Sequence, residues 1–257
     1  NLGLILIKSN RESGINYIKK AAKMGDVNAM RHYSEILMST NESKKDAIKY
    51  LKDAADCGDP NSSYSLAQIL QHGTNNISID KKSAAFYYKK SAEQGNICAM
   101  NNLAWMLQHG DGIEIDKNEA SRFYKLAADL GQPDAMFNYA WMIQNGEISE
   151  TDIKIAVKFY KMAADCGQVN AMNSFGWLLQ RGIGVETDLE ASCSFFKKAA
   201  DGGHPKAAFN YGLALYSGTG TEINKEEALL YFKKASELGC VDAMFSAGLM
   251  ICIGDGV

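Results

Sequence analysis

The stretch that decides the fold runs from Gly95 to Gly131 and reads GNICAMNNLAWMLQHGDGIEIDKNEASRFYKLAADLG. The next stretch, from Gly131 to Gly167, reads GQPDAMFNYAWMIQNGEISETDIKIAVKFYKMAADCG and repeats the same pattern in register. Self-similarity at a fixed period of this length is typical of proteins built from stacked supersecondary units. These two stretches therefore define a unit against which the rest of the chain can be aligned.

Working outward, one glycine closes each unit along most of the chain. Four of the six intervals between these glycines are 36 residues, and the first two are 33 and 37. The glycines are Gly25, Gly58, Gly95, Gly131, Gly167, Gly203 and Gly239. They predict complete repeats at about 26–58, 59–95, 96–131, 132–167, 168–203 and 204–239, with a partial unit at each end. Because the chain starts at Asn1 and stops inside a loop pattern, we interpret residues 1–257 as a single repeat array from a longer polypeptide.

The second half of each repeat predicts an amphipathic helix, here called helix B. Fifteen residues before each glycine stands a residue type that favours helix N-caps: Asn10, Ser43, Asp80, Asp116, Asp152, Asp188 and Asn224. The glycine itself can end the helix in a left-handed conformation. Bulky pairs such as Phe159-Tyr160 precede small pairs such as Ala163-Ala164 by one turn. This alternation lets neighbouring helices approach closely.

The first half of each repeat predicts a second helix, here called helix A. Apolar residues fall at positions 4, 5, 8, 9, 11 and 12 after the glycine, which is one side of an α-helix. In two repeats they are Ala99, Met100, Leu103, Ala104, Met106 and Leu107, and Ala135, Met136, Tyr139, Ala140, Met142 and Ile143. A glycine-containing loop leads on to helix B, and no strand pattern appears. We predict an all-α solenoid of about six 36-residue helix-turn-helix repeats.

Three motifs resemble the Sel-one-like repeat (SLR), a relative of the tetratricopeptide repeat: Ala-x-x-x-Leu-Gly/Ala-x-x-Leu, Gly-x-Gly-Val-x-x-Asp and Ala-x-x-Phe-Tyr-Lys-x-Ala-Ala-x-x-Gly. Residues 182–188 match the loop motif fully and residues 110–116 nearly so, whereas the loops at 39–43 and 146–148 depart from it. The resemblance implies a right-handed α-α superhelix whose A helices line a concave face. It also implies a role as an adaptor or scaffold. A tetratricopeptide array of 34-residue repeats is the alternative, and the longer loops argue against it.

The side of helix A opposite the apolar stripe predicts a partner-binding groove. All three tryptophans stand at position 10 of consecutive repeats: Trp105, Trp141 and Trp177. Around them are Asn102, Asn138 and Asn210 at position 7, Gln108, Gln144 and Gln180 at position 13, His72, His109 and Arg181 at position 14, and Phe137 and Phe209 at position 6. Exposed Trp is enriched at binding hot spots, and amides can pair with peptide groups. The other interpretation is that the tryptophans fill gaps between repeats.

The remaining surface is predicted to be a solvated face of helix B. Six residues before each glycine stands a lysine, and in six of the seven repeats an acid follows four residues later, as in Lys89 and Glu93. Such pairs contribute only tenths of a kcal/mol. A nucleic-acid-binding stripe would lack the interleaved acids, and the net charge of −3 gives no reason to expect a nucleic-acid partner.

Composition sets further limits on partners and location. No apolar run approaches the roughly 20 residues that span a bilayer, so we predict no membrane insertion. The six cysteines form no CxxC and no recurring pair, which favours reduced thiols in a cytoplasmic protein. A secreted branch of the SLR family staples each repeat with a cysteine pair, and this pattern is missing. His72 and His109 share a repeat position but are expected to lie too far apart for one metal ion.

Catalysis finds little support in the sequence. Ser78-x-x-Lys81 and Ser194-x-x-Lys197 match a motif of penicillin-recognising enzymes, but the accompanying motifs are missing. We predict no catalytic residues, no cofactor and no metal. The predicted function is a non-enzymatic protein–protein interaction scaffold that binds a peptide or domain in the groove. The alternative is a regulatory or spacer region of a larger multidomain protein, for example one fused to a kinase or acting in a ubiquitin-ligase complex, where other domains of the same chain are partners.

Overall fold

The computed structural model describes residues 11–40, 44–74 and 77–256. Within these ranges the regular structure is helical, and the only β pairing is one isolated bridge between Thr74 and Ile77. The prediction of an all-α fold is confirmed. The N-caps predicted at Asn10 and Ser43 lie outside the described residues. The chain divides into two compact units, residues 1–127 and residues 128–257, and each is described by itself.

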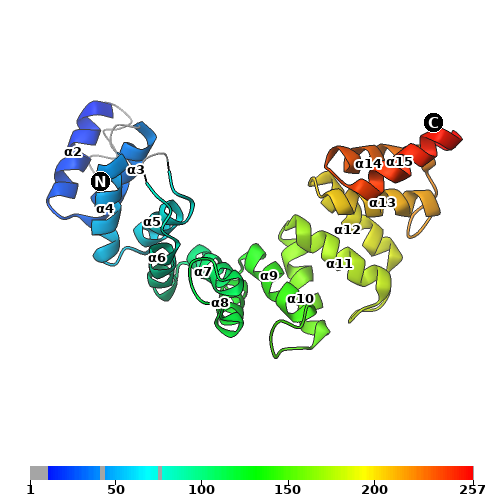
Figure 1. Cartoon of the computed structure of the whole chain (residues 1–257), viewed down its shortest axis with the longest axis horizontal. Coiled ribbons are helices and arrows are strands. Elements are labelled where there is room, and N and C mark those ends of the chain that lie inside the picture. Colours follow the sequence, from blue (N-terminus) through cyan, green and yellow to red (C-terminus); the bar gives the residue numbers. More distant parts are fainter. Residues whose placement is uncertain (1–10, 41–43, 75–76, 257) are drawn as a thin grey trace. The chain divides into compact units, whose positions relative to one another are not determined.

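The helices alternate between the two predicted types (Figure 1). The B helices are α2 (Arg11–Lys23), α4 (Lys44–Asp56), α6 (Lys81–Glu93), α8 (Lys117–Asp129), α10 (Ile153–Asp165), α12 (Leu189–Asp201) and α14 (Lys225–Glu237). The A helices are α3 (Val27–Thr40), α5 (Pro60–His72), α7 (Ile97–His109), α9 (Pro133–Gln144), α11 (Val169–Arg181), α13 (Pro205–Ser217) and α15 (Val241–Ile253). Helices α2 to α7 belong to unit 1 and α9 to α15 to unit 2, while α8 crosses the boundary between them.

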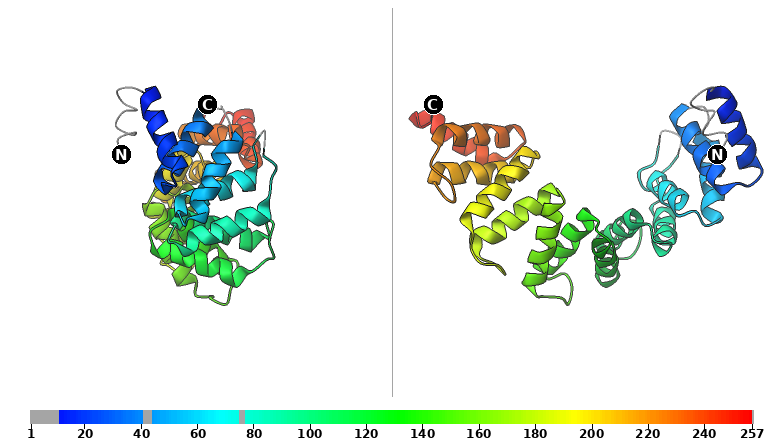
Figure 2. Two further views of the ribbon diagram at one scale, coloured as in Figure 1. Left: turned by 90° about the vertical axis from the view of Figure 1, so that its left-hand side faces the viewer. Right: turned by 180° about the vertical axis from the view of Figure 1, so that it is seen from behind.

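Each helix packs against the next one along the chain. In unit 1 this succession runs from α2 to α7, and in unit 2 from α9 to α15 (Figure 2). Within each unit, an A helix thus contacts the B helix before it and the B helix after it, where those helices belong to the same unit. This is the stacking of helix pairs that defines an α-solenoid.

The ends of the B helices follow the predicted signals closely. Asp80, Asp152, Asp188 and Asn224 cap their helices with a side-chain oxygen, and Asp116 accepts a hydrogen bond from the backbone N–H of Glu119 at 2.9 Å. One detail of the prediction needs correction, because the helices stop two residues before the repeat glycine. The glycine then turns the chain at a φ of about +90°, as in a Schellman motif.

The A helices have caps that the sequence analysis did not predict. After every repeat glycine except Gly239, the next residue accepts a hydrogen bond with its side chain from the first turn of helix A. These residues are Asp26, Asp59, Asn96, Gln132, Gln168 and His204. One glycine therefore separates the end of a B helix from the cap of the following A helix, which makes this turn short and well defined.

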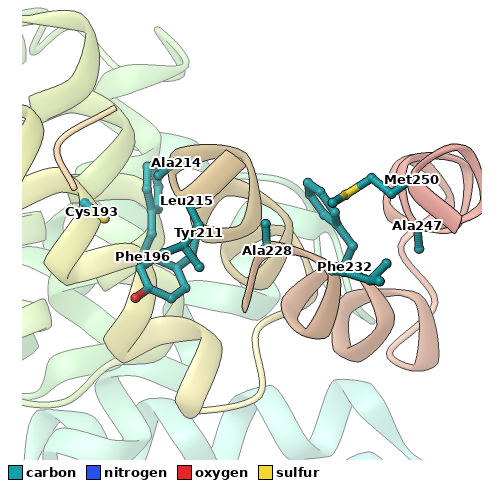
Figure 3. Packing of buried hydrophobic residues seen from close by; sticks show 10 residues of the cluster. Cys193, Phe196, Tyr211, Ala214, Leu215, Ala228, Phe232, Ala247 and Met250 are labelled. Atoms are coloured by element: carbon teal, nitrogen blue, oxygen red, sulfur yellow. The ribbon is translucent and has the colours of Figure 1, made fainter. Parts of the chain in front are cut away.

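The core of each unit lies between consecutive helices. The six stripe residues predicted after Gly131 are all buried, and so are those after Gly95 except Leu107, which is half-buried. At two places a glycine on helix A receives the ring of a helix B phenylalanine. A Cβ at Gly176 would lie 3.0 Å from the ring of Phe196, and one at Gly212 would lie 2.7 Å from the ring of Phe232. Figure 3 shows the second ring beside the Met250 side chain in the last cluster of unit 2.

The second glycine of the Gly-x-Gly loops has a packing role. The loop between a helix A and its helix B rests on the start of the previous helix B, and a Cβ at Gly220 would collide with the backbone of Leu189. Gly112 lies in the same way against Lys81, and Gly184 lies against Ile153. The loop motif is therefore explained by a close approach between neighbouring repeats.

Gly220→Ala is expected to destabilise the protein more than Gly203→Ala. Both glycines have a positive φ, +73° and +87°, but only the Cβ at Gly220 meets backbone atoms. Gly203→Ala should cost about 1–2 kcal/mol, because only left-handed strain is added. Gly220→Ala should cost about 2 kcal/mol more, because the loop must move away from its neighbour. Urea denaturation of both variants checks this, and equal losses would contradict the packing role of the loop.

Because of His204, the protein is expected to lose stability as the pH falls into the mildly acidic range. Its Nδ1 accepts the backbone N–H of Ala207 at 3.1 Å. Burial lowers the pKa of His204, and the neighbouring Lys206 lowers it further, although a backbone hydrogen bond of His204 opposes them. Because the folded protein favours the neutral ring, this stability is complete above the ordinary pKa of about 6.5. It is lost as the pH falls through the lower folded value.

The matched control is His204→Gln, since Gln132 and Gln168 cap the equivalent helices without titrating. Thermal unfolding of both proteins between about pH 7.5 and pH 5 measures the difference. The wild-type protein should lose more of its midpoint temperature on acidification than the variant. Parallel curves would show that the cap does not titrate.

Candidate ligand-binding groove

The predicted groove face of helix A is hollowed in unit 1. An open hollow of about 560 Å³ lies against α5, α7 and the start of α6. Its lining residues are Gln71, His72, Ile79, Lys81, Asn101, Asn102, Trp105 and Asp111. Three predicted groove residues, His72, Asn102 and Trp105, are thus brought together by the fold.

A chain of hydrogen bonds fixes the floor of this hollow. The Asn102 amide donates to the Tyr88 hydroxyl at 3.3 Å, and this hydroxyl donates to Gln71 Oε1 at 2.9 Å. The Gln71 amide then donates to Asp111 Oδ2 at 3.3 Å, while Asp111 Oδ1 pairs with Lys81 Nζ at 2.5 Å. Tyr88 and Gln71 are both buried. A satisfied polar network of this kind holds three helices and a loop in one arrangement.

The electrostatics of the floor suit these donor and acceptor roles. The hydrogen bond from Lys81 is the main reason that the pKa of Asp111 is lowered, and burial opposes it. Asp111 therefore stays a carboxylate at neutral pH. Burial raises the pKa of Tyr88 to about 12, so its phenol keeps the proton that it donates to Gln71.

Trp105 stands at the rim of the hollow with 41% of its surface exposed. The His109 ring stacks on the indole with centroids 4.6 Å apart, and its Nδ1 lies 2.9 Å from the Trp105 carbonyl oxygen. His109 therefore supports Trp105 from one side and does not line the hollow. The exposed part of the indole stays open to a ligand.

The glutamines at position 13 have a structural role wherever helix B supplies a tyrosine. Three pairs, Tyr88–Gln71, Tyr124–Gln108 and Tyr160–Gln144, have Oη–Oε1 distances of 2.9, 3.1 and 2.6 Å. Gln108 is only 7% exposed, so it faces the interior and not the groove. Helix α12 carries Phe196 at the equivalent position, and Gln180 is exposed. These glutamines look alike in the sequence, because the tyrosine that distinguishes them lies on the next helix B.

The tryptophans of unit 2 differ from one another. Trp141 is 38% exposed, and the Asn145 amide donates to its carbonyl oxygen at 2.8 Å. Trp177 is half-buried against the last hydrophobic cluster, and the Arg181 guanidinium lies 5.0 Å from its ring centroid. Trp177 thus fits the interpretation that the tryptophans fill gaps between repeats, whereas Trp141 has the exposure expected of a groove residue.

The remaining predicted groove residues are partly committed to packing. Phe137 lies 5.7 Å from the ring of Tyr160, and Phe209 lies 5.7 Å from the ring of Phe232. Asn210 donates to Asn173 Oδ1 at 3.3 Å, which ties α13 to α11. Asn138 is half-buried on α9. These side chains support the A helices more than they project from them.

Among the described residues, no group of three His, Cys, Asp or Glu side chains is arranged to hold a metal ion. None of the described helices combines the length and the apolar character needed to cross a membrane. The six cysteines, all of which are described, are unpaired, and only Cys193 is buried.

Comparison with known proteins assigns the chain to a family. The Sel1 repeat model matches residues 2–26, 31–59, 60–96, 99–132, 133–168, 169–204 and 205–240. The chain belongs to the Sel1 repeat family. The resemblance inferred from the sequence motifs is therefore confirmed. No curated protein matches the chain.

Two solved Sel1-type structures share the fold. The protective antigen c5321 of uropathogenic Escherichia coli, which displays an SLR fold, is 26% identical with a TM-score of 0.86 over 93% of this chain. A Sel1 repeat protein from Oxalobacter formigenes is 24% identical with a TM-score of 0.80 over 97% of this chain. The chain spans 52% of the length of the first protein and 75% of the second.

Sel1 repeat proteins are generally scaffolds for protein interactions and are typically not catalytic. Membership in the family therefore supports an interaction role for this array in general terms. The hollow around Trp105 offers both an exposed aromatic ring and polar groups that are fixed by hydrogen bonds.

Sequence reasoning missed Lys81 and Asp111 as parts of the hollow. A usable signal exists, because a lysine at the first position of helix B is followed 30 residues later by an acid between two glycines. The same spacing recurs at Lys225 and Asp255, whose Nζ and Oδ1 are 2.9 Å apart. In this Sel1 array the pair joins one loop to the start of the preceding helix B.

Tyr88→Phe is expected to destabilise the Sel1 array more than Tyr160→Phe. Without the hydroxyl, the buried Gln71 loses its donor, which should cost about 1–3 kcal/mol. Gln144 is half-exposed and can bond to water in place of Tyr160, so the loss there should stay below about 1 kcal/mol. Urea denaturation compares the two variants. A loss at Tyr160 equal to that at Tyr88 would show that burial of the glutamine is irrelevant.

Proposed function

We propose that this Sel1 repeat array is a non-enzymatic scaffold whose helix A face in unit 1 binds a segment of another protein around Trp105. One observation carries the proposal. An indole that is 41% exposed stands at a hollow of about 560 Å³, and the side chains of the hollow's floor are hydrogen-bonded to one another. A side chain held in place before binding loses little entropy when a ligand arrives. Exposed Trp at such a place is the residue type most typical of a hot spot.

The lining of the hollow suits a peptide segment. Trp105 and Ile79, which are 41% and 58% exposed, offer apolar contact for one ligand side chain. Asn101 and His72 lie beside them and can meet the N–H and C=O groups of a peptide backbone. Both oxygens of Asp111 are engaged by Lys81 and Gln71, so this carboxylate needs no ligand cation. The alternative role, as a regulatory or spacer region of a larger protein, stays a prediction.

The test compares two tryptophans that differ in burial. Proteins captured on the wild-type array are identified, and the best-represented partner is titrated calorimetrically against wild type, Trp105→Ala and Trp177→Ala. Trp105→Ala should weaken binding about tenfold or more, with little change in the unfolding midpoint, because its ring is exposed. Trp177→Ala should lower the midpoint instead, because its ring packs on the core.

Two results would contradict the proposal. Trp105→Ala could bind the partner as tightly as the wild-type protein does, which would remove the indole from the binding surface. Trp105→Ala could also unfold as readily as Trp177→Ala, which would make Trp105 a gap-filling residue. Circular dichroism of each variant confirms the helical fold before the titrations.

A further inference from the structure

The hollow around Trp105, here called the Trp105 hollow, has a floor whose oxygens already accept hydrogen bonds. Gln71 Oε1 accepts from the Tyr88 hydroxyl at 2.9 Å. The two carboxylate oxygens of Asp111 accept from Lys81 and from the Gln71 amide, at 2.5 and 3.3 Å. An N–H group of a ligand would therefore meet acceptors that are already engaged.

The donors of the same hollow are less fully used. The indole N–H of Trp105 and the ring of His72 have no hydrogen-bond partner among the described residues. Lys81 Nζ can donate three hydrogen bonds, and Asp111 takes one of them. An indole N–H and an ammonium group can only donate, so they pair only with acceptor atoms of a ligand. The hydrogen-bonding groups left in the hollow thus favour a ligand rich in carbonyl or carboxylate oxygens.

The charges of the hollow decide between these two kinds of oxygen. Apart from His72, the ionisable side chains of the lining are Lys81 and Asp111, and they form an ion pair. The hydrogen bond from Lys81 is also the main reason that the pKa of Asp111 is lowered, so this carboxyl stays charged at neutral pH. A ligand carboxylate that approached Lys81 would be repelled by the carboxylate already bound there. Uncharged carbonyl oxygens can accept from the donors without this repulsion.

The apolar side of the hollow suits a flat, rigid group of the ligand. Trp105 and Ile79 line it and are 41% and 58% exposed. The His109 ring stacks on the indole with centroids 4.6 Å apart, which helps to fix the orientation of the indole. A proline ring can pack on such a surface, and proline has no backbone N–H that would need a partner. Segments in the polyproline II conformation have no internal hydrogen bonds, and they dock on grooves lined by aromatic residues.

The indole donor is a property of this repeat and not of the fold. The C-terminal end of unit 2 forms a similar floor, since Lys225 Nζ lies 2.9 Å from Asp255 Oδ1 and the Tyr216 hydroxyl donates to Asp255 Oδ2 at 3.1 Å. Counted from the repeat glycine, Leu249 there occupies the place of Trp105. Leu249 is 50% exposed, but its side chain has no hydrogen-bonding group. The two places therefore share the ion pair and differ in the donor.

We propose that the Trp105 hollow binds an uncharged, proline-rich segment of a second protein in the polyproline II conformation. A proline ring of the segment packs on the Trp105 indole and Ile79, and carbonyl oxygens of the segment accept from the indole N–H and from Lys81. This inference names the chemical class of the ligand for the groove proposed above, so it rests on the proposed function.

Three fluorescein-labelled peptides test the chemistry of the site by fluorescence anisotropy. Their sequences are GPPLPPLPG, GAALAALAG and EPPLPPLPE. GPPLPPLPG should bind saturably, and its affinity should hardly change between about 50 mM and about 500 mM salt, because no net charge is involved. GAALAALAG should bind at least about tenfold more weakly, because its flexible backbone must be ordered on binding. EPPLPPLPE should bind no more tightly than GPPLPPLPG does.

Three results with the peptides would overturn the proposal. They are no saturable binding of GPPLPPLPG, equal binding of GPPLPPLPG and GAALAALAG, and binding of EPPLPPLPE that is about tenfold tighter than that of GPPLPPLPG. The last result would mean that the hollow selects charge and not carbonyl oxygens.

Variants at one repeat position locate the peptide and separate its two contacts. Trp105→Phe keeps an aromatic ring and removes the N–H, so it should weaken GPPLPPLPG binding about fivefold. Trp105→Ala removes both contacts and should weaken it further. Leu249→Ala is the matched control, because it truncates an exposed side chain at the same repeat position beside a similar ion pair, and it should leave the affinity unchanged. Unchanged binding by Trp105→Phe would overturn the proposal, since the indole N–H would then have no part in recognition.

Competition separates this inference from the proposed function. GPPLPPLPG should displace the partner that is captured on the wild-type array. A partner that needs Trp105 but is not displaced would overturn the proline-rich ligand and leave the scaffold function intact. A partner that binds Trp105→Ala as tightly as the wild-type protein would contradict the proposed function, and this inference would fall with it.

Discussion

The structure depends on one recurring contact, in which a large ring of helix B is seated over a small residue of a neighbouring helix A. Phe196 over Gly176 and Phe232 over Gly212 show it in its tightest form. The ring fills the space that a missing Cβ leaves, so two backbones approach closely and little volume is left empty. Where the ring belongs to a tyrosine, its hydroxyl reaches a glutamine at the end of helix A, so the core also fixes polar groups.

This contact determines what the other side of helix A can do. The small residues of helix A pack in the core. The opposite side of the helix is exposed in some repeats, and in others it also packs against neighbouring residues. Trp105 stays open above a network that begins at the core residue Tyr88, whereas Trp177 is drawn against the core. The same fold thus yields a preorganised hollow in one place and a filled gap in another, and side-chain identity decides between them.

The fold could be predicted almost entirely from the sequence, because caps, stripes and glycines are local signals that repeat in register. The Asp80 cap and the stripe after Gly131 needed no knowledge of distant contacts. The site was predicted less completely. Gln108 and Gln180 share a repeat position, yet only the first meets a tyrosine hydroxyl from the next helix. The position of a polar residue on its own helix does not predict which side chain of the neighbouring helix it contacts.

Lys81 and Asp111 were missed for the same reason, since their ion pair joins a helix start to a loop of the following repeat. A single helical wheel does not relate two such segments. The caps of the A helices were missed for a different reason. Gln132, Gln168 and His204 are uncommon cap residues, and they obscure the pattern that Asp26, Asp59 and Asn96 form at the same repeat position.

The contacts between repeats reach only a short way along the chain. The loop pair Lys225 and Asp255 joins residues 30 apart, and the amide pair Asn173 and Asn210 joins residues 37 apart. An array of this kind can gain or lose repeats without disruption of a shared hydrophobic core, because each repeat contacts only its neighbours. Duplication of one repeat would therefore carry its hollow along intact. Later side-chain changes at a few lining positions would then give each copy a different ligand preference.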